Sequence, residues 1–245
     1  GQPQIASAQE SCIDELALEL DMDPAELRRK NMLATGKVSA TGQRIGDSCG
    51  LPEALDAVLA ASGWSERRSQ KKLDTTGSKV RGLGLATGYY GVGLSAGGKH
   101  IDRAHAAIQI DADGSVSVAV GNTEMGQGAR SELAQIAADA LGAPYEMVTV
   151  HPVDTTRVPD SGPTVASRTT ISSGQAVIAA AAPLRQQLEG VARRLLDSPV
   201  SVSEGCFSTM GDNHSELSFF RVVEQCYAER HPMQSVGQWV TPDTS

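Results

Sequence analysis

The segment Gly121–Gly128, which reads GNTEMGQG, has the composition of a turn that binds an anion. It follows a strand pattern that ends at Val120 and precedes a helix pattern that begins at Ala129. Such a turn brings backbone N–H groups and the positive end of the helix dipole close to a bound phosphate. The segment has neither GxGxxG spacing nor the Lys-Ser/Thr pair of a Walker A loop. An ordinary strand-to-helix turn is therefore an equal alternative.

A second polar segment, residues 162–175, reads GPTVASRTTISSGQ and also precedes a helix pattern. Its Ser and Thr hydroxyls and the Gln175 amide could satisfy many acceptor atoms of a polyanionic ligand. The alternative is a polar loop that caps the helix. Two such helix starts in one domain are less commonplace than one, and this favours the binding interpretation.

Strands and helices alternate around these two segments. Residues 104–110 and 115–120 alternate apolar and polar side chains around Asp113-Gly114, which predicts a β-hairpin. Pro183 lies inside a long helix pattern and predicts a kink or a break there. The other predicted elements are strands at residues 145–151 and 235–240 and helices at residues 129–141, 173–196 and 219–229.

The N-terminal part of the chain contains only helix patterns, at residues 9–20, 23–33 and 51–63. Asp23 fits an N-cap, Pro24 fits the first helical position, and Glu26 completes a capping box. The apolar side chains at helical spacing that should be buried in the first helix are Cys12, Ile13, Leu16, Ala17 and Leu20.

Residues 65–79 are polar and basic and predict a surface loop, and residues 81–94 are glycine-rich and predict an extended, strand-like stretch. We therefore expect an α+β fold in which mixed sheets with flanking helices form two subdomains. Residues 1–75 would be the helical first part. Residues 76–245 would be the strand-helix cofactor-binding subdomain, incomplete at its C-terminal end.

Composition excludes several classes of function. The chain has 245 residues and a net charge of −8, which argues against nucleic acid or an anionic membrane surface as partner. No apolar run reaches the ~20 residues that span a bilayer. The four cysteines have no CxxC spacing, so we expect reduced thiols in a cytoplasmic protein. Since the chain lacks an initiator Met and stops after a strand pattern, we expect it to be a piece of a longer protein.

The two polar segments together resemble the xanthine dehydrogenase and aldehyde oxidase family of molybdenum hydroxylases. GNTEMGQG followed by ARSELAQIAADALGAP is similar to the family signature, and PTVASRTTISSGQAV resembles its second cofactor segment. The opening GQPQ, the run IDELALELDMDPAELRRKNML and the segment RGLGLATGYYGVG fit the same pattern. The resemblance covers nearly the whole chain up to Leu188 and is weaker beyond it.

The resemblance implies molybdopterin with molybdenum as the cofactor, in its cytosine dinucleotide form. It implies that Ala166 leaves room for the metal and that Gln2 lies by the first turn in contact with the cofactor. A flat substrate would lie near Tyr89, Tyr90 and Leu94, although a structural role for the tyrosines is at least as strong an alternative. The remaining residues implied in binding the cofactor are Gly126, Gln127, Gly128, Ser167, Thr169, Thr170, Ser172 and Gln175.

The activity implied is oxidative hydroxylation of an aldehyde or an aromatic heterocycle. The family's general base is a Glu in a Gly-Glu-Pro motif, which this sequence lacks, so no catalytic residue and no protein ligand to the metal is expected here. Glu124 is expected to orient backbone N–H groups of its turn. Iron–sulfur and FAD centres would belong to partner domains or subunits. The alternatives are a cofactor-binding module without catalysis and a phosphate-binding FAD or NAD oxidoreductase.

Overall fold

A computed structural model describes residues 2–40, 42–70, 82–91, 93–94, 101–210 and 214–241. The fold is α+β, as the sequence predicted. The chain forms two compact units, one reaching Tyr90 and the other beginning at Gly91. The boundary expected near residue 75 lies outside the described residues. Residues 82–90 belong to the first unit and form no strand, so the strand prediction for this stretch is wrong in its described part.

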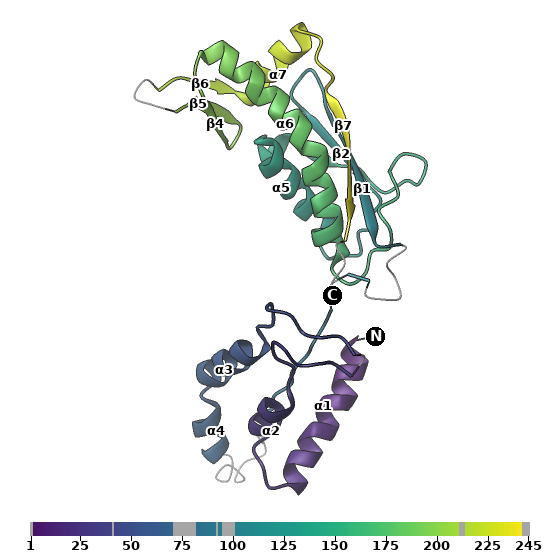
Figure 1. The fold of residues 1–245 in the computed structure, drawn as a ribbon, viewed down its shortest axis with the longest axis vertical. Coiled ribbons are helices and arrows are strands. Elements are labelled where there is room, and N and C mark those ends of the chain that lie inside the picture. Colours follow the sequence, from purple (N-terminus) through teal and green to yellow (C-terminus); the bar gives the residue numbers. More distant parts are fainter. Residues whose placement is uncertain are drawn as a thin grey trace, which may run out of the picture. The chain divides into compact units, whose positions relative to one another are not determined.

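The first unit consists of helices. Its helices are α1 (Gln2–Glu19), α2 (Pro24–Asn31), α3 (Leu51–Ser62) and α4 (Trp64–Gln70) (Figure 1). Helix α1 includes the QPQ stretch, so the turn expected there is wrong. Helix α4 likewise replaces the first part of the loop predicted at residues 65–79, whose remainder lies outside the described residues.

An ion-pair network, and not an apolar stripe, determines which face of α1 is buried. The Arg28 guanidinium donates to Glu10 Oε2 at 2.7 Å and to Asp14 Oδ1 at 2.8 Å. Ala17 is buried on the same helix, whereas Leu16 and Leu20 are about half exposed. The predicted apolar face is thus confirmed at Ala17, with Ile13 half-buried, and is wrong for Cys12, Leu16 and Leu20. The buried Arg28 requires carboxylates beside it.

The predicted cap of α2 is confirmed. The Asp23 carboxylate accepts from the Ala25 N–H at 2.7 Å, and Pro24 occupies the first turn. The same carboxylate accepts from the Trp64 indole N–H at 3.2 Å, which ties α4 to α2. Glu26, which was predicted to complete a capping box with Asp23, instead pairs with Lys30 one turn along the helix.

The second unit contains a four-stranded sheet with helices on one face. The predicted hairpin is confirmed as β1 (Arg103–Ile110) and β2 (Val116–Val120), which pair antiparallel. Strand β7 (Gln234–Val240) pairs antiparallel with β1, and β3 (Val148–Val150) pairs parallel with β2. Helices α5 (Ala129–Leu141) and α6 (Gly174–Leu196) cover one face of this sheet (Figure 1).

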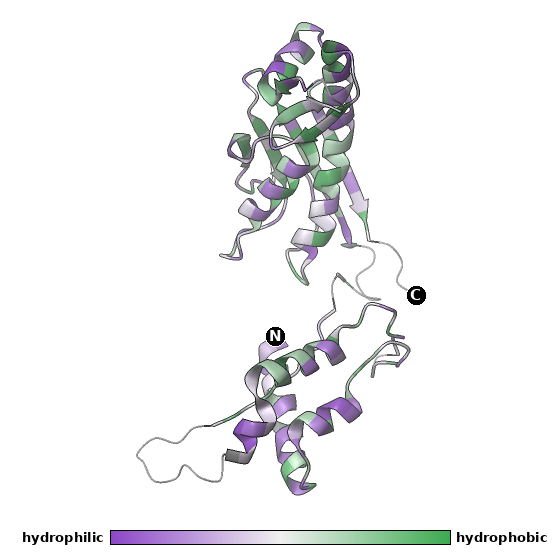
Figure 2. Ribbon diagram, turned by 90° about the vertical axis from the view of Figure 1, so that its left-hand side faces the viewer, coloured by the Kyte–Doolittle hydropathy of each residue, from purple (hydrophilic) through white to green (hydrophobic). Residues whose placement is uncertain are grey.

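Period-two alternation along the hairpin produces the core. Ala104, Ala106, Ile108 and Ile110 of β1 are buried against the helices, and the residues between them face outward. Helices α5 and α6 supply small Ala side chains to the same core. In Figure 2 the helices carry both hydrophobic and hydrophilic residues, as expected for helices with one buried face.

Several local expectations for the second unit differ from the structure. Residues Tyr145–Met147 form a 3-10 turn before the short β3, so the predicted strand is half its expected length. Helix α6 is unbroken through Pro183, which is exposed, so the predicted break is absent from this described helix. A small antiparallel sheet was not predicted; its strands are β4 (Val200–Ser203), β5 (Cys206–Thr209) and β6 (Glu216–Ser218).

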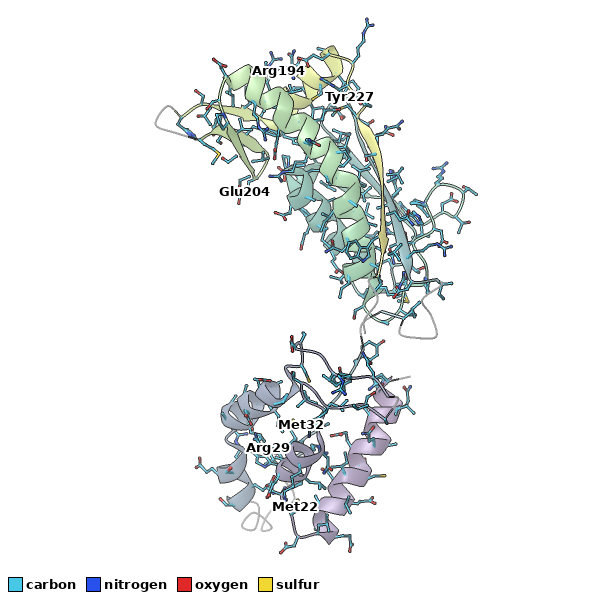
Figure 3. The ribbon with its side chains drawn as sticks, in the orientation of Figure 1. Met22, Arg29, Met32, Arg194, Glu204 and Tyr227 are labelled. Carbon is cyan, nitrogen blue, oxygen red and sulfur yellow. The ribbon has the colours of Figure 1, made fainter. Side chains whose placement is uncertain are left out.

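The predicted helix and strand near the C-terminus are confirmed as α7 (Phe219–Ala228) and β7. Arg194 of α6 and Tyr227 of α7 lie at the same end of this unit (Figure 3). Arg194 pairs with Glu229 just beyond α7, and the Tyr227 hydroxyl donates to the Ile110 carbonyl at 2.7 Å. Hydrogen bonds from Gln225, Arg194 and His231 lower the pKa of Glu229 to about 2. These contacts connect α6, α7 and the end of β1.

Candidate functional site

The glycine segment is held by its own carboxylate. Glu124 Oε1 accepts the N–H groups of Gly126 at 2.8 Å and Gly128 at 3.1 Å, and Oε2 accepts that of Arg130 at 3.2 Å. These hydrogen bonds, that of Arg130 first, lower the pKa of Glu124. The structural role expected for Glu124 is confirmed. Three of the amides proposed as an anion cradle therefore already have an acceptor.

Gln127 closes the same turn from the other side. Its Oε1 accepts the Met125 N–H at 2.6 Å, and its Nε2 donates to the Thr123 carbonyl at 2.8 Å. Gly126 and Gly128 have φ of +96° and +83°, a conformation that favours glycine, and a Cβ at either position would have open space around it. The turn is thus exposed and internally hydrogen-bonded at the start of α5.

The second segment enters α6 through an unusual backbone. Ala166 and Ser167 both have positive φ, at 51° and 58°. Thr169–Ser173 then form a π-helical turn directly before α6. Positive φ at non-glycine residues stores strain, and π turns are frequent at functional sites.

The predicted cofactor residues of this segment differ in their exposure to solvent. Thr169 and Ser172 are buried, and the Ser172 hydroxyl lies 3.5 Å from that of Thr241. Ser167, Thr170 and Gln175 are exposed and available to a ligand. Ala166 is half-buried beside them.

The structure brings the two segments together. Asn122 Nδ2 donates to Thr169 Oγ1 at 3.3 Å, and the Thr123 N–H donates to Thr164 Oγ1 at 2.9 Å. At Gly121 a Cβ would lie 2.7 Å from the Pro159 carbonyl oxygen, so only glycine allows this approach. The Asn122 amide oxygen and the Ser173 hydroxyl are buried near this junction and have no protein partner in the described part of the chain. Buried polar atoms without partners near the junction of these two segments fit a site that takes a polar group.

A buried arginine that sequence reasoning did not single out anchors the second segment. Arg168 is fully buried, and its Nε donates to Asp102 Oδ1 at 2.6 Å. Burial alone would raise the pKa of Asp102, but hydrogen bonds from Arg168 and from the Leu94 N–H hold it below its ordinary value. A lone Arg within a run of Ser and Thr was the only available signal in the sequence.

Of the three predicted substrate residues, Leu94 lies beside the second segment. The Leu94 N–H donates to Asp102 Oδ2 at 3.1 Å, and the Gly93 N–H donates to the Ala166 carbonyl at 2.9 Å. Tyr89 and Tyr90 belong to the first unit, where both are exposed. Gln2 also belongs to that unit, at the start of α1. Roles for these three residues remain predictions.

A groove of about 780 Å³ lies elsewhere, on the sheet face opposite α5 and α6. Ala107, Ala119, His151 and Asp154 are among the residues that line it. None of the predicted site residues lines this groove. Within the described ranges no cluster of three or more His, Cys, Asp or Glu side chains is arranged to hold a metal ion, and no helix there is long and apolar enough to cross a membrane.

Comparison with known proteins identifies the family of this chain. A family model described as the molybdopterin cofactor-binding domain matches residues 57–245. Xanthine dehydrogenase of Oryza sativa subsp. japonica is 29% identical over 243 residues, which cover 99% of this chain and 16% of that protein. The nicotine 6-hydroxylase large subunit of Paenarthrobacter nicotinovorans is 28% identical over 232 residues, which cover 90% of this chain and 28% of that protein.

Solved structures share the fold. Quinoline 2-oxidoreductase from Pseudomonas putida 86 superposes with a TM-score of 0.79 at 23% identity, over 97% of this chain and 33% of that one. Aldehyde oxidoreductase from Desulfovibrio desulfuricans ATCC 27774 superposes with a TM-score of 0.70 at 28% identity, over 99% and 24%. The chain thus spans about a third or less of the length of these relatives. It belongs to the molybdopterin cofactor-binding domain family of the molybdenum hydroxylases.

Proposed function

We propose that this chain is part of a molybdenum hydroxylase subunit and supports oxidative hydroxylation of an aldehyde or an aromatic heterocycle. The observation that carries the proposal is the junction between the two segments, where Asn122 bonds Thr169. It places the exposed turn before α5 beside the exposed hydroxyls before α6. A cofactor with a long polar tail would contact both segments at once.

The residues present fit such a cofactor. Gln127 and the two glycines around it would contact the phosphate or nucleotide end. The exposed Ser167, Thr170 and Gln175 would donate to the pterin and diphosphate oxygens. Thr169 and Ser172 are buried, so in this proposal they support the segment from below. Ala166 would leave space on the metal side.

The bound group would supply a two-electron acceptor for oxidising the carbon that receives a water-derived oxygen. In this chain the carboxylate nearest the turn, Glu124, is committed to three N–H donors and is therefore a poor proton acceptor. We accordingly place the general base outside this chain. We further propose the cytosine dinucleotide form of the cofactor, iron–sulfur and FAD centres on partner subunits, and a cytoplasmic location.

A matched pair of glutamines on α6 tests the cradle. Gln175 and Gln186 are both exposed on this helix, but only Gln175 lies at the predicted site. In the assembled enzyme, Gln175→Ala should lower molybdenum content measured by elemental mass spectrometry several-fold, and Gln186→Ala should not. Equal loading in both variants would contradict the role of Gln175.

A matched pair of glycines tests the turn. Gly128 and Gly36 share a φ of +83°, and a Cβ added at either position would have open space around it, so substitution strains both backbones alike. Gly128→Val should lower molybdenum content, while Gly36→Val should load like the wild type. Wild-type enzyme that carries stoichiometric flavin without molybdenum would overturn the proposed function itself.

A further inference from the structure

The guanidinium of Arg168 joins separate segments of the second unit. Besides the bond from Nε to Asp102, its Nη1 donates to the Pro163 carbonyl at 2.6 Å and to the Ser161 carbonyl at 3.2 Å. Its Nη2 donates to the Arg103 carbonyl at 2.8 Å. A planar, always charged fork with several donors suits such a site, and Lys cannot reproduce it. The buried cation therefore holds the loop at residues 161–168 against the start of β1 at Arg103.

The arrangement so held is a strained one. Ala166 and Ser167, directly before Arg168, both have positive φ. Residues in such conformations persist only where the surroundings determine them. At Gly162 a Cβ would lie 2.9 Å from Arg168 Nη2, so the loop is also packed closely around the guanidinium. Arg168 is thus the side chain that fixes where Ala166 lies.

Asp102 extends this control to the Gly93–Leu94 backbone. Its Oδ1 accepts from Arg168, and its Oδ2 accepts from the Leu94 N–H at 3.1 Å. The Gly93 N–H completes the link by donating to the Ala166 carbonyl at 2.9 Å. The buried Asp102 carboxylate therefore connects the segment that contains Ala166 to the segment that contains Leu94.

We propose that Asp102 and Arg168 form a positioning pair that sets the distance between Ala166 and Gly93–Leu94, and thereby the space open to the substrate. The inference rests on the proposed function. Neither side chain reaches a ligand, because both are buried and act through the backbone atoms that they bind. Loss of the pair should shift these two backbone segments relative to each other, and displacements of about 1 Å can cost ~100-fold in rate.

Hydrogen exchange in the assembled enzyme tests the link independently of catalysis. The Arg168→Lys variant keeps the positive charge but loses the planar guanidinium and its several donors. In the Asp102→Asn variant an amide NH2 group replaces one carboxylate oxygen and faces an N–H donor. Exchange at the Gly93 and Leu94 amides should rise at least tenfold in both variants. Arg221→Met removes an exposed arginine that pairs with Glu224, and it should leave these rates unchanged. Unchanged exchange in both site variants would overturn the inference.

Steady-state kinetics separates positioning from simple stability. Arg168→Lys should retain most of its molybdenum, while KM rises and kcat/KM falls by at least tenfold. A fall in activity that only follows lost molybdenum, with KM unchanged, would show a structural role and overturn the inference. If the wild-type enzyme lacked molybdenum, the proposed function would fail, and with it the substrate part of this inference. The exchange experiment would still decide whether the pair couples Ala166 to Gly93–Leu94.

Discussion

Asn122 and Thr169, 47 residues apart in the chain, are joined by a side-chain hydrogen bond of 3.3 Å. Both residues are buried, at 4% and 7% exposure. The bond holds the turn before α5 to the start of α6, and the distance between the two halves of the proposed cradle depends on it.

Removing this bond should therefore cost stability. Asn122→Ala leaves the buried Thr169 hydroxyl without its donor, and we expect the free energy of unfolding to fall by about 1–3 kcal/mol in urea titrations. Asn31→Ala removes the side chain that donates to the Leu27 carbonyl near the surface, and should change it by less than about 0.5 kcal/mol. An equal fall in the free energy of unfolding in both variants would show that the buried Asn122 bond stabilises the fold no more than the Asn31 bond does.

The Glu124 turn should lose stability in acid. Its N–H donors lower the pKa of Glu124 below the ordinary value of 4.5. A carboxylate with a lowered folded pKa stabilises the fold above its unfolded pKa, and this contribution is lost as the pH falls through the folded pKa. The Tm of wild type should exceed that of Glu124→Gln at pH 7, and the two should converge below pH 4.5. A constant difference across this range would contradict the assignment.

Side-chain size at Ala166 should affect turnover more than cofactor loading. Ala166→Phe fills the proposed metal-side space, so kcat should fall at least tenfold while molybdenum content stays close to wild type. Ala166→Gly keeps the space and relieves the positive φ of 51°, so its turnover should resemble wild type. Full activity in the Phe variant would exclude Ala166 from the substrate side of the site.

Strand β7 approaches α6 more closely than any side chain at residue 237 allows. A Cβ at Gly237 would lie 2.2 Å from the Ala180 backbone nitrogen and 2.3 Å from the Ala176 carbonyl oxygen. Gly237→Ala should cost about 3 kcal/mol or more of unfolding free energy, because neither backbone can yield cheaply. Gly190→Ala, in α6 with open space around it, should stabilise by about 0.5–1 kcal/mol. Chemical denaturation of the two variants checks the opposite signs.

Thiol labelling should separate the cysteines by burial. Burial, with a smaller effect from the Glu229 charge, raises the pKa of Cys226 to about 11, so little thiolate exists at pH 8. Cys12 is exposed on α1. Iodoacetamide should modify Cys12 rapidly and Cys226 only after denaturation, as read by peptide mass spectrometry. Comparable native rates would show that the α7 side of the core opens readily.

Local sequence patterns were sufficient for most elements of the second unit. The alternation around Asp113-Gly114 predicted the β1–β2 hairpin, and the helix pattern at residues 129–141 predicted α5. In the first unit, the start of α2 at Asp23 and Pro24 was predicted in the same way. These features depend on neighbouring residues, so their physical causes lie within a few positions of one another.

Patterns failed where a distant partner decides the outcome. Helix α1 buries Glu10 and not Leu16, because Arg28 from another helix needs a carboxylate. The strands of the small β4–β5–β6 sheet are three or four residues long, too short for alternation to mark them. Pro183 leaves α6 unbroken, and α6 residues on both sides of it, such as Val177 and Leu188, are buried in the core.

The glycine and Ser/Thr segments, with the helix that follows each, were determined by the sequence itself, since turn chemistry and helix capping act locally. Only the tertiary structure decided that Asn122 meets Thr169 and that Asp102 and Arg168 hold the loop at Ala166. Those relationships join residues up to 66 positions apart through buried polar atoms. They depend on which polar groups are buried next to one another when the sheet and its helices pack, and a local sequence pattern does not predict this.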